Sequence, residues 1–279
     1  MRTDADIMPL RMDLEAERMD FQHMMFQNMY EGALFLSPIK LDANSSVLDA
    51  GTGTGLWAID LADDNPNTKV IGVDLSAIQP AFVPPNAEFY IEDLEDPWTF
   101  SKPFDLIFAR MLTGSIGDWP KFYRQSFEHL SPGGYIELTD IVFPIQCDDG
   151  TLDKDSALYQ WGKLTVDAAA KLGRPLRTTT AVVSELVDAG FTDITQHHFK
   201  WPTNHWPKDP KMKELGAWTY EDVGKNVYGL TVALFTRGLG WTLEEFEVFL
   251  VQVRKEMRDP KIHGYFPIYA IHARKPDET

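Results

Sequence analysis

Val47-Leu48-Asp49-Ala50-Gly51-Thr52-Gly53-Thr54-Gly55 is the stretch that decides the fold. Apolar residues lead to an acid, three glycines follow at alternate positions, and a helical pattern begins at Leu56-Trp57-Ala58-Ile59. This order predicts a buried strand that turns sharply into a helix, and such a turn is a frequent ligand site in α/β proteins. Glycines let the backbone approach a bound molecule, and the helix N-terminus adds free N–H groups and a positive dipole end.

The spacing of these glycines separates two familiar ligands. A dinucleotide fingerprint has the order G-x-G-x-x-G, whereas the order here is G-x-G-x-G, and Asp49 stands two residues before the first glycine. A carboxylate at that place would repel a pyrophosphate, so a dinucleotide dehydrogenase is the disfavoured alternative. The acid suits a ligand with a positive group and no phosphates, and S-adenosylmethionine, with its ammonium and sulfonium groups, is the leading candidate.

The composition is that of an ordinary globular protein. The chain has 279 residues, 44% of them hydrophobic, which is ample for the core of one large domain or two small ones. Lys+Arg is 26 against Asp+Glu 42, a formal charge of −16, and this argues against nucleic acid as a partner because phosphate binding needs a basic surface. The single cysteine, Cys147, excludes an internal disulfide and fits the cytoplasm, with the nucleus as another compartment. We expect neither a targeting signal nor a membrane-spanning segment.

Acidic residues also follow the next two predicted strands. The stretch 69–74 is a second buried strand that ends on Asp74, 19 residues beyond Gly55 and close to the expected place of an acid that binds ribose hydroxyls. Its alternative role is a turn or helix-capping acid. The stretch 87–91 is a third strand, and Asp93 in the acidic run after it is placed to accept a hydrogen bond from an adenine amino group, although such runs are usually solvated.

Strand and helix alternate through the rest of the first half. A fourth strand at 104–109 ends at Arg110, a helix is expected from Trp119 to Leu130, and a fifth strand at 135–139 follows the breaker 131–134. This alternation predicts a parallel, doubly wound sheet, in which ligands gather at the carboxyl ends of the strands.

The remaining segments predict additions to this sheet. Residues 13–36 have the pattern of an amphipathic helix, which either packs on the core or forms a lid with His23 or Tyr30 touching the ligand. We expect one domain with four parts, whose bounds are 1–40 for the helical lid, 41–201 for the core sheet, 202–262 for a cap insertion rich in aromatic residues, and 263–279 for the last strand and tail. The cap makes an apolar acceptor site plausible.

Five motifs in order carry a family likeness. VLDAGTGTG at 47–55, VIGVDLS at 70–76, IEDLED at 91–96, FDLIFARM at 104–111 and LSPGGYIEL at 130–138 resemble the motifs of class I S-adenosylmethionine-dependent methyltransferases. The stretches 17–39, 57–66, 201–218 and 262–276 are similar to the LaeA-like methyltransferases of filamentous fungi, so the likeness runs over almost the whole chain.

This resemblance implies a fold and a set of ligand contacts. The fold is a Rossmann-like, seven-stranded sheet with an antiparallel last strand, a lid helix over the cofactor and a cap before the last strand. In such a family the acid and glycines of the first loop hold the methionine part of the cofactor, the second acid holds the ribose, and the third acid with the following amide holds the adenine. The implied cofactor-binding residues are Tyr30, Asp49, Gly51, Thr52, Gly53, Asp74, Leu75, Asp93, Leu94 and Arg110.

The chemistry needs few catalytic groups. Methyl transfer is an in-line displacement for which the protein mainly aligns a nucleophile and excludes water, and a general base helps an oxygen or nitrogen acceptor. His23 and His205 are the candidate bases, although each has an alternative role as a structural hydrogen-bonding residue. No cluster has metal-ligand spacing, so we expect no metal.

The expected function is therefore methyl transfer to a small-molecule acceptor, on an oxygen of a fungal secondary metabolite, with S-adenosylhomocysteine as product. One alternative is a LaeA-like regulatory protein that acts through protein partners. Another is an enzyme that binds the cofactor on the same fold without transferring its methyl group. Mass spectrometry of products formed from methyl-labelled cofactor distinguishes the last alternative from the first hypothesis.

Overall fold

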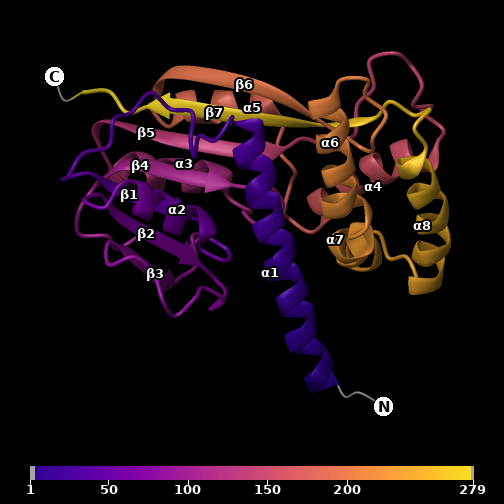
Figure 1. Ribbon diagram of the computed structural model, residues 1–279, viewed down its shortest axis with the longest axis horizontal. Coiled ribbons are helices and arrows are strands. Elements are labelled where there is room, and N and C mark those ends of the chain that lie inside the picture. Colours follow the sequence, from indigo (N-terminus) through magenta and orange to yellow (C-terminus); the bar gives the residue numbers. More distant parts are fainter. Residues whose placement is uncertain (1–3, 278–279) are drawn as a thin grey trace.

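One mixed sheet forms the centre of the molecule (Figure 1). The computed structural model describes residues 4–277, with side chains described from Leu14 onward. The strands are β1 (Ser46–Ala50), β2 (Lys69–Asp74), β3 (Ala87–Ile91), β4 (Phe104–Arg110), β5 (Leu130–Ile141), β6 (Thr192–Pro202) and β7 (Tyr265–Arg274). Their order is β3-β2-β1-β4-β5-β7-β6, and β7 runs antiparallel to both of its neighbours. The expected seven-stranded sheet with an antiparallel last strand is confirmed.

Helices cover both faces of this sheet. They are α1 (Asp4–Met29), α2 (Leu56–Asp64), α3 (Trp119–His129), α4 (Ala157–Lys171), α5 (Thr179–Asp188), α6 (Pro210–Thr219), α7 (Val227–Ala233) and α8 (Leu243–Arg258), with π-helical turns η1 (Tyr220–Gly224) and η2 (Leu234–Gly238). Aromatic side chains of α3 pack on one face and Trp57 of α2 on the other. Because both faces are covered, β1 and β4 are almost continuously apolar and buried. No helix within residues 4–277 combines the length and apolarity that crossing a membrane requires.

The lid helix α1 ends seven residues before the predicted end at Leu36. Glu31 and Gly32 adopt left-handed backbone conformations, and the Gly32 amide donates to the Gln27 carbonyl at 2.8 Å. This arrangement closes the last turn of a helix. Beyond it, the amides of Leu36 and Ser37 donate to the buried carboxylate of Glu137 on β5, at 2.9 and 2.6 Å. The segment after α1 is therefore attached to the middle of the sheet.

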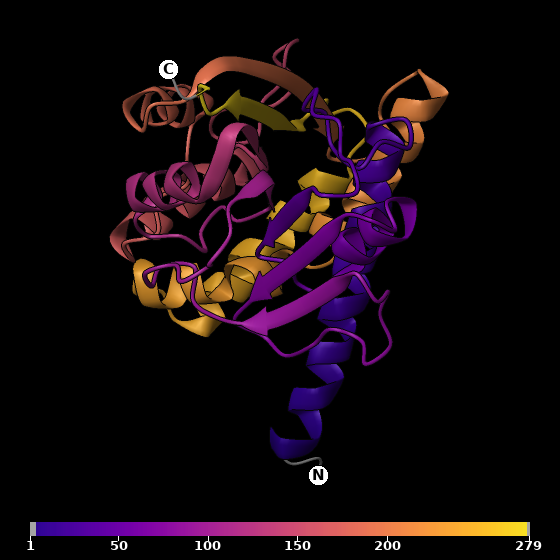
Figure 2. The same ribbon diagram turned by 90° about the vertical axis from the view of Figure 1, so that its left-hand side faces the viewer.

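The cap lies beyond the carboxyl ends of the parallel strands, and the arrows of β4 and β5 point toward α1 in Figure 1. It contains α6, α7 and α8, which come from the chain between β6 and β7 as expected, but α4 also packs against α8 and η2. The turned view shows the early strands in front of these cap helices (Figure 2). Starting the cap at residue 202 therefore leaves out one of its four helices, because α4 precedes β6 in the chain. Large aromatic side chains fill its core, among them Trp161, Trp201, Phe235 and Phe246.

The β5 strand is longer than the predicted 135–139. Pairing with β4 starts at Leu130, and the register then shifts between Phe104 and Leu106. The breaker 131–134 ends α3 as expected and forms this irregularity, with Gly133 at a φ of 80°. The chain therefore passes from helix to strand without a separate loop.

Candidate active site

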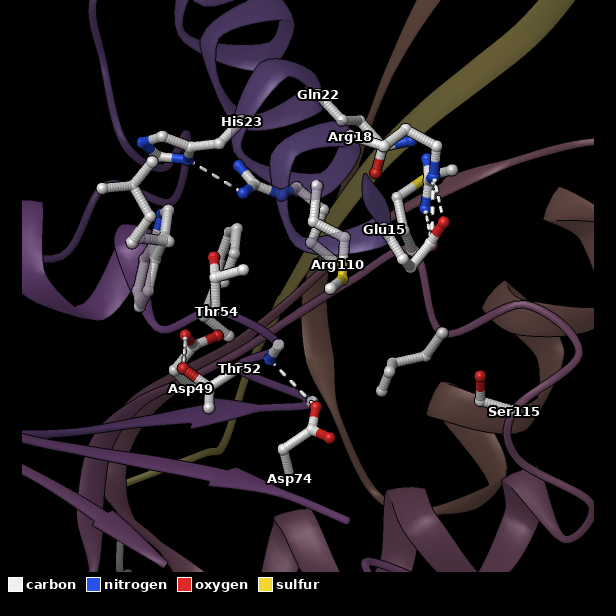
Figure 3. A pocket seen from close by; sticks show the side chains of 18 residues that line it. Glu15, Arg18, Gln22, His23, Asp49, Thr52, Thr54, Asp74, Arg110 and Ser115 are labelled. Carbon is white, nitrogen blue, oxygen red and sulfur yellow. Dashed lines mark hydrogen bonds and ion pairs between the residues drawn. The ribbon is translucent and has the colours of Figure 1, made fainter. Parts of the chain in front are cut away.

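A cavity of about 300 Å³ lies at the carboxyl ends of β1, β2 and β4, underneath α1 (Figure 3). We call it the glycine-loop cavity, because Gly51, Thr52, Gly53 and Thr54 line it. Gly51 and Gly53 have φ values of 77° and 56°, which side chains rarely adopt. A Cβ atom on Gly51 would stand 2.3 Å from Cδ2 of Leu112. The loop therefore requires glycine at this place and exposes its backbone to the cavity.

Asp49 is a buried carboxylate at the wall of the glycine-loop cavity. Its Oδ2 accepts a hydrogen bond from the Thr52 hydroxyl at 2.6 Å. Burial raises the pKa of Asp49 to about 6, although the Thr52 hydrogen bond and the charge of Arg110 act in the opposite direction. Ionising this group in the free protein is costly. A cationic ligand in the cavity would lower that cost, so the arrangement favours an ammonium group.

Arg110 enters the same cavity from the end of β4. Its guanidinium lies over the rings of Phe26 and Phe108, with centroids 4.7 and 5.8 Å from Cζ. Burial lowers the pKa of Arg110 to about 10, while Asp49 raises it. The side chain remains a cation at neutral pH, and it offers N–H donors to an anionic group such as a carboxylate.

His23 lines the cavity, as expected for the lid, but both of its ring nitrogens have partners. Nδ1 lies 2.9 Å from a terminal nitrogen of Arg110, and Nε2 lies 2.9 Å from Oδ2 of Asp60 on α2. Arginine has only donors, so Nδ1 accepts and Nε2–H donates to the carboxylate. Burial, followed by the charge of Arg110, lowers the pKa of His23. In this geometry the ring orients Arg110, and neither nitrogen is free to accept a proton from a substrate.

A second, smaller cavity of about 150 Å³ continues from the first one. We call it the acidic cavity, and its lining includes Leu75, Asp93 and Leu94, with Gly51 and Asp74 shared between the two cavities. Oδ2 of Asp74 accepts from the Gly53 amide and Oδ1 from the Ser76 amide, both at 2.9 Å. Asp74 thus fixes the glycine loop and faces both cavities. The four predicted strand-end residues for ribose and adenine are brought together along one groove.

Two predicted site residues lie elsewhere. The Tyr30 hydroxyl is buried and hydrogen-bonded to Oγ1 of Thr139 at 2.8 Å, because α1 ends just before this residue and its ring packs between Phe26 and Phe199. His205 is exposed in the segment before α6 and lines none of the three cavities described. The structure therefore does not bring either side chain to the ligand groove. Among the described residues, no group of three metal-ligating side chains gathers.

A third cavity of about 360 Å³ lies between the core and the cap. We call it the apolar cavity, because most of its lining side chains are apolar, among them Ile141, Phe143, Trp161, Leu176, Val223, Leu230 and Leu234. It shares four lining residues with the glycine-loop cavity: Arg18, Gln22, Met111 and Ser115. Met111 has a φ of 56°, which is strained for a residue with a side chain. The two cavities therefore meet under α1, next to the loop that follows β4.

Sequence reasoning did not identify the residues at this meeting point. Arg18 and Gln22 donate to Oδ1 and Oδ2 of Asp222 at 2.7 and 2.9 Å, and Asp222 is fully buried in η1. Burial raises the pKa of Asp222, and the charge of Arg18 opposes this effect. The only sequence signal was the spacing of Arg18 and Gln22, which are four residues apart and therefore share one face of a helix.

A family model described as a methyltransferase domain matches residues 21–196, which is more than half of the chain. The chain belongs to this methyltransferase family. The match extends from the lid helix α1 to β6 and contains the glycine loop, Asp74, Asp93 and Arg110. The resemblance drawn from the ordered motifs is confirmed, and the protein is a methyltransferase of the S-adenosylmethionine-dependent class.

Relatives of this methyltransferase include both enzymes and regulators. Methyltransferase pytC of Aspergillus terreus is 38% identical over 263 residues, which cover 94% of this chain and 81% of pytC. The secondary metabolism regulator LAE1 of Cochliobolus heterostrophus is 38% identical over 270 residues, 95% of this chain and 88% of LAE1. The protein-methionine methyltransferase laeA of Emericella nidulans is 36% identical over 266 residues, 94% of this chain and 70% of laeA. The LaeA-like likeness is thereby confirmed.

Solved structures place this methyltransferase on a common fold. Phosphoethanolamine N-methyltransferase 2 of Haemonchus contortus, in complex with S-adenosyl-L-methionine, aligns with a TM-score of 0.54 at 18% identity over 90% of this chain. This chain spans about half of that longer protein, 52%. The [4+2]-cyclase SpnF aligns with a TM-score of 0.52 at 17% identity, over 85% of this chain and 77% of the cyclase. The fold is thus shared by proteins of different activities.

Proposed function

We propose that this methyltransferase transfers a methyl group to an oxygen of a small molecule bound in the apolar cavity, in fungal secondary metabolism. The observation that carries the proposal is the junction of the glycine-loop cavity with the apolar cavity, where Arg18, Gln22, Met111 and Ser115 belong to both walls. A donor in one cavity and an acceptor in the other then face each other across this junction. Such fixed proximity is the main catalytic contribution that methyl transfer needs.

The residues of the groove fit the chemical groups of S-adenosylmethionine. The buried carboxylate of Asp49 suits its ammonium, and the guanidinium of Arg110 suits its carboxylate. Asp74 suits the ribose hydroxyls, while Asp93 and the Leu94 amide suit the adenine at the far end of the acidic cavity. When bound, the cofactor supplies an activated methyl group on a sulfonium.

The lid helix α1 supplies the closure that the reaction needs. Arg18 and Gln22 attach α1 to the cap through Asp222, and His23 attaches it to α2 through Asp60. The helix is thus attached on both sides of the junction, and it keeps bulk water away from the reacting atoms. Its contacts also orient Arg110, so the closed lid and the donor subsite are formed together.

A matched pair of variants tests the use of the apolar cavity. Ala233 lines this cavity and is itself exposed, so Ala233→Trp should fill the cavity without disturbing the core. We expect the variant to bind S-adenosylmethionine as the wild type does and to lose transfer of labelled methyl to small molecules of a fungal metabolite extract, measured by mass spectrometry. Ala43→Trp, in an exposed loop before β1, is the control. Unchanged transfer by Ala233→Trp would reject the apolar cavity as the acceptor site.

A second candidate is methylation of, or regulation through, a protein partner. The names of two relatives, a secondary metabolism regulator and a protein-methionine methyltransferase, favour it. The cavity of about 360 Å³ supports a small acceptor instead, because a regulator without one has no need of such a cavity. Labelled methyl recovered only on protein would favour the second candidate. Product formed without any label would favour the third alternative, an enzyme that binds the cofactor and does not methylate.

A further inference from the structure

The polar groups of the apolar cavity are few and mostly neutral. They comprise one guanidinium, one amide and four hydroxyls, which belong to Arg18, Gln22, Thr113, Ser115, Thr165 and Thr231. Among the described residues, its lining contains no Asp, Glu, His, Lys, Cys or Tyr side chain. The hydroxyls of Thr165 and Thr231 donate to helix carbonyls, those of Trp161 and Val227, at 2.8 and 2.6 Å. The cavity therefore offers no obvious group to remove a proton from an acceptor.

The titratable groups near the junction, which lie in the glycine-loop cavity or, for Asp222, in the cap, already have hydrogen-bond partners. Glu15 accepts from Arg18 on the same helix, and Asp49 accepts from Thr52. His23 has both ring nitrogens occupied, and Asp222 accepts from two side chains of α1 on the cap side. A neutral alcohol or a protonated amine must lose a proton as it is methylated. The described groups that face the junction do not provide for that loss.

The junction instead presents hydrogen-bond donors. Arg18 uses Nε and one N–H of a terminal nitrogen toward Glu15, and its other terminal nitrogen donates to Asp222. A guanidinium has five N–H groups and an amide has two, so each terminal nitrogen of Arg18 and the amide of Gln22 keep a further N–H. Asp222, fully buried, fixes the position of both side chains. This donor set is suited to an oxygen anion.

Resting on the proposed function, we propose that the acceptor is an apolar molecule whose nucleophile is already an oxygen anion at neutral pH, a carboxylate or an acidic phenol or enol, and that Arg18 and Gln22 hold this oxygen at the junction. The oxygen uses a lone pair to form the O–CH₃ bond, while the sulfur keeps the electron pair of the broken S–CH₃ bond. The anion and the sulfonium become neutral together, and no proton has to be removed. Asp222 is the positioning residue for the two donors.

The acidity of the acceptor provides the first test. para-Phenylphenol and its ring-fluorinated derivatives keep nearly one shape while their acidity changes. With each, and with S-adenosylmethionine, the acid limb of the pH profile of kcat/KM should move with the pKa of the phenol. Biphenylcarboxylate should be methylated, whereas biphenylmethanol and biphenylmethylamine should not. Two results would show a base in the protein and overturn the inference. One is an acid limb of kcat/KM that stays fixed while the acceptor pKa changes. The other is methylation of the alcohol at the rate of the carboxylate.

Binding provides the second test, independent of turnover. Arg18→Gln should weaken the binding of biphenylcarboxylate at least tenfold in calorimetry with S-adenosylhomocysteine present. The affinity for biphenylmethanol should stay within threefold of the wild-type value. The control Glu15→Gln removes a partner of the same guanidinium and should not weaken the carboxylate. Since Arg18→Gln alone leaves Asp222 buried without its cation, the double variant with Asp222→Asn should fold and show the same loss. Equal losses for acid and alcohol would overturn the role of Arg18.

The two failures are distinguishable. If the cofactor binds but none of these compounds or extract metabolites receives label, the proposed function fails and the inference fails with it. If label reaches neutral acceptors with an acid limb that does not follow their pKa, small-molecule methylation stands and only the anionic acceptor is rejected.

Discussion

Replacing Asp49 with Asn should stabilise the free protein and impair its function. The pKa of this buried carboxyl is about 6, against an ordinary value of 3.8. Below about pH 3 the group is protonated in both the folded and the unfolded chain, so it has no effect there. As the pH rises toward about 6 the unfolded chain ionises first, so stability falls, and above that pH the penalty is constant. The difference of about 2 pKa units corresponds to roughly 3 kcal/mol.

The assay compares Asp49→Asn with the wild type in thermal or urea unfolding, without cofactor, at about pH 4.5 and about pH 8. The advantage of the variant should grow from about 1 to roughly 3 kcal/mol. The larger value is on the order of 5 °C in Tm for a chain of this size. Glu137 and Asp140 are buried with raised pKa values too, but they are common to both proteins and cancel in the difference. Asp64→Asn, at an exposed position, is the control.

Saturating S-adenosylmethionine should reverse the order of the two proteins, because the ammonium then compensates the carboxylate that the variant lacks. Calorimetry should show at least tenfold weaker binding to Asp49→Asn, and wild-type affinity should fall as the pH drops below about 6. A stability difference that does not change with pH would refute the cost assigned to burial. Equal cofactor affinity in the two proteins would refute the ammonium role.

Substitutions at two further positions probe the groove. Asp74→Ala should weaken the binding of S-adenosylmethionine by roughly 1–3 kcal/mol, the scale of hydrogen bonds left unmade. Asp64→Ala is the control. Unchanged affinity of Asp74→Ala in calorimetry would exclude Asp74 from the ribose role. His23→Asn keeps an acceptor where Nδ1 faces Arg110, whereas His23→Gln keeps only the donor toward Asp60, so the Asn variant should retain the tighter cofactor binding. Both variants should keep the acid limb of the pH profile of kcat/KM. Its disappearance would identify His23 as a general base.

The strand-end residues were predictable because parallel strands bring their carboxyl ends to one edge. Asp49, Asp74, Asp93 and Arg110 each follow a predicted strand, and the structure places all four along one groove. Local pattern was sufficient here, since a strand followed by a turn fixes where its last side chain lies. The alternation of strands and helices predicted the parallel sheet, and the family resemblance implied its antiparallel last strand.

The acceptor side was not predictable, because its residues meet only in the tertiary structure. Arg18 and Asp222 are 204 positions apart, and no local pattern links them. The structure shows that one face of α4 is buried and that this helix packs against α8, a contact between segments far apart in the sequence. Tyr30 was misplaced for a local reason, since the left-handed residues after Met29 end the helix and direct the ring to Thr139.

The attachment of Leu36 and Ser37 to Glu137 has a consequence for synthesis of the chain on the ribosome. The carboxylate lies about a hundred residues after the amides that it binds, with sequence separations of 101 and 100. The lid segment therefore emerges first, and its attachment to Glu137 cannot form until β5 has left the exit tunnel. Until then the early strands have an uncovered face, and a nascent chain that ends before Glu137 should bind chaperones. Although α1 is made before the core sheet, its attachment to that sheet forms only after the fifth strand is made.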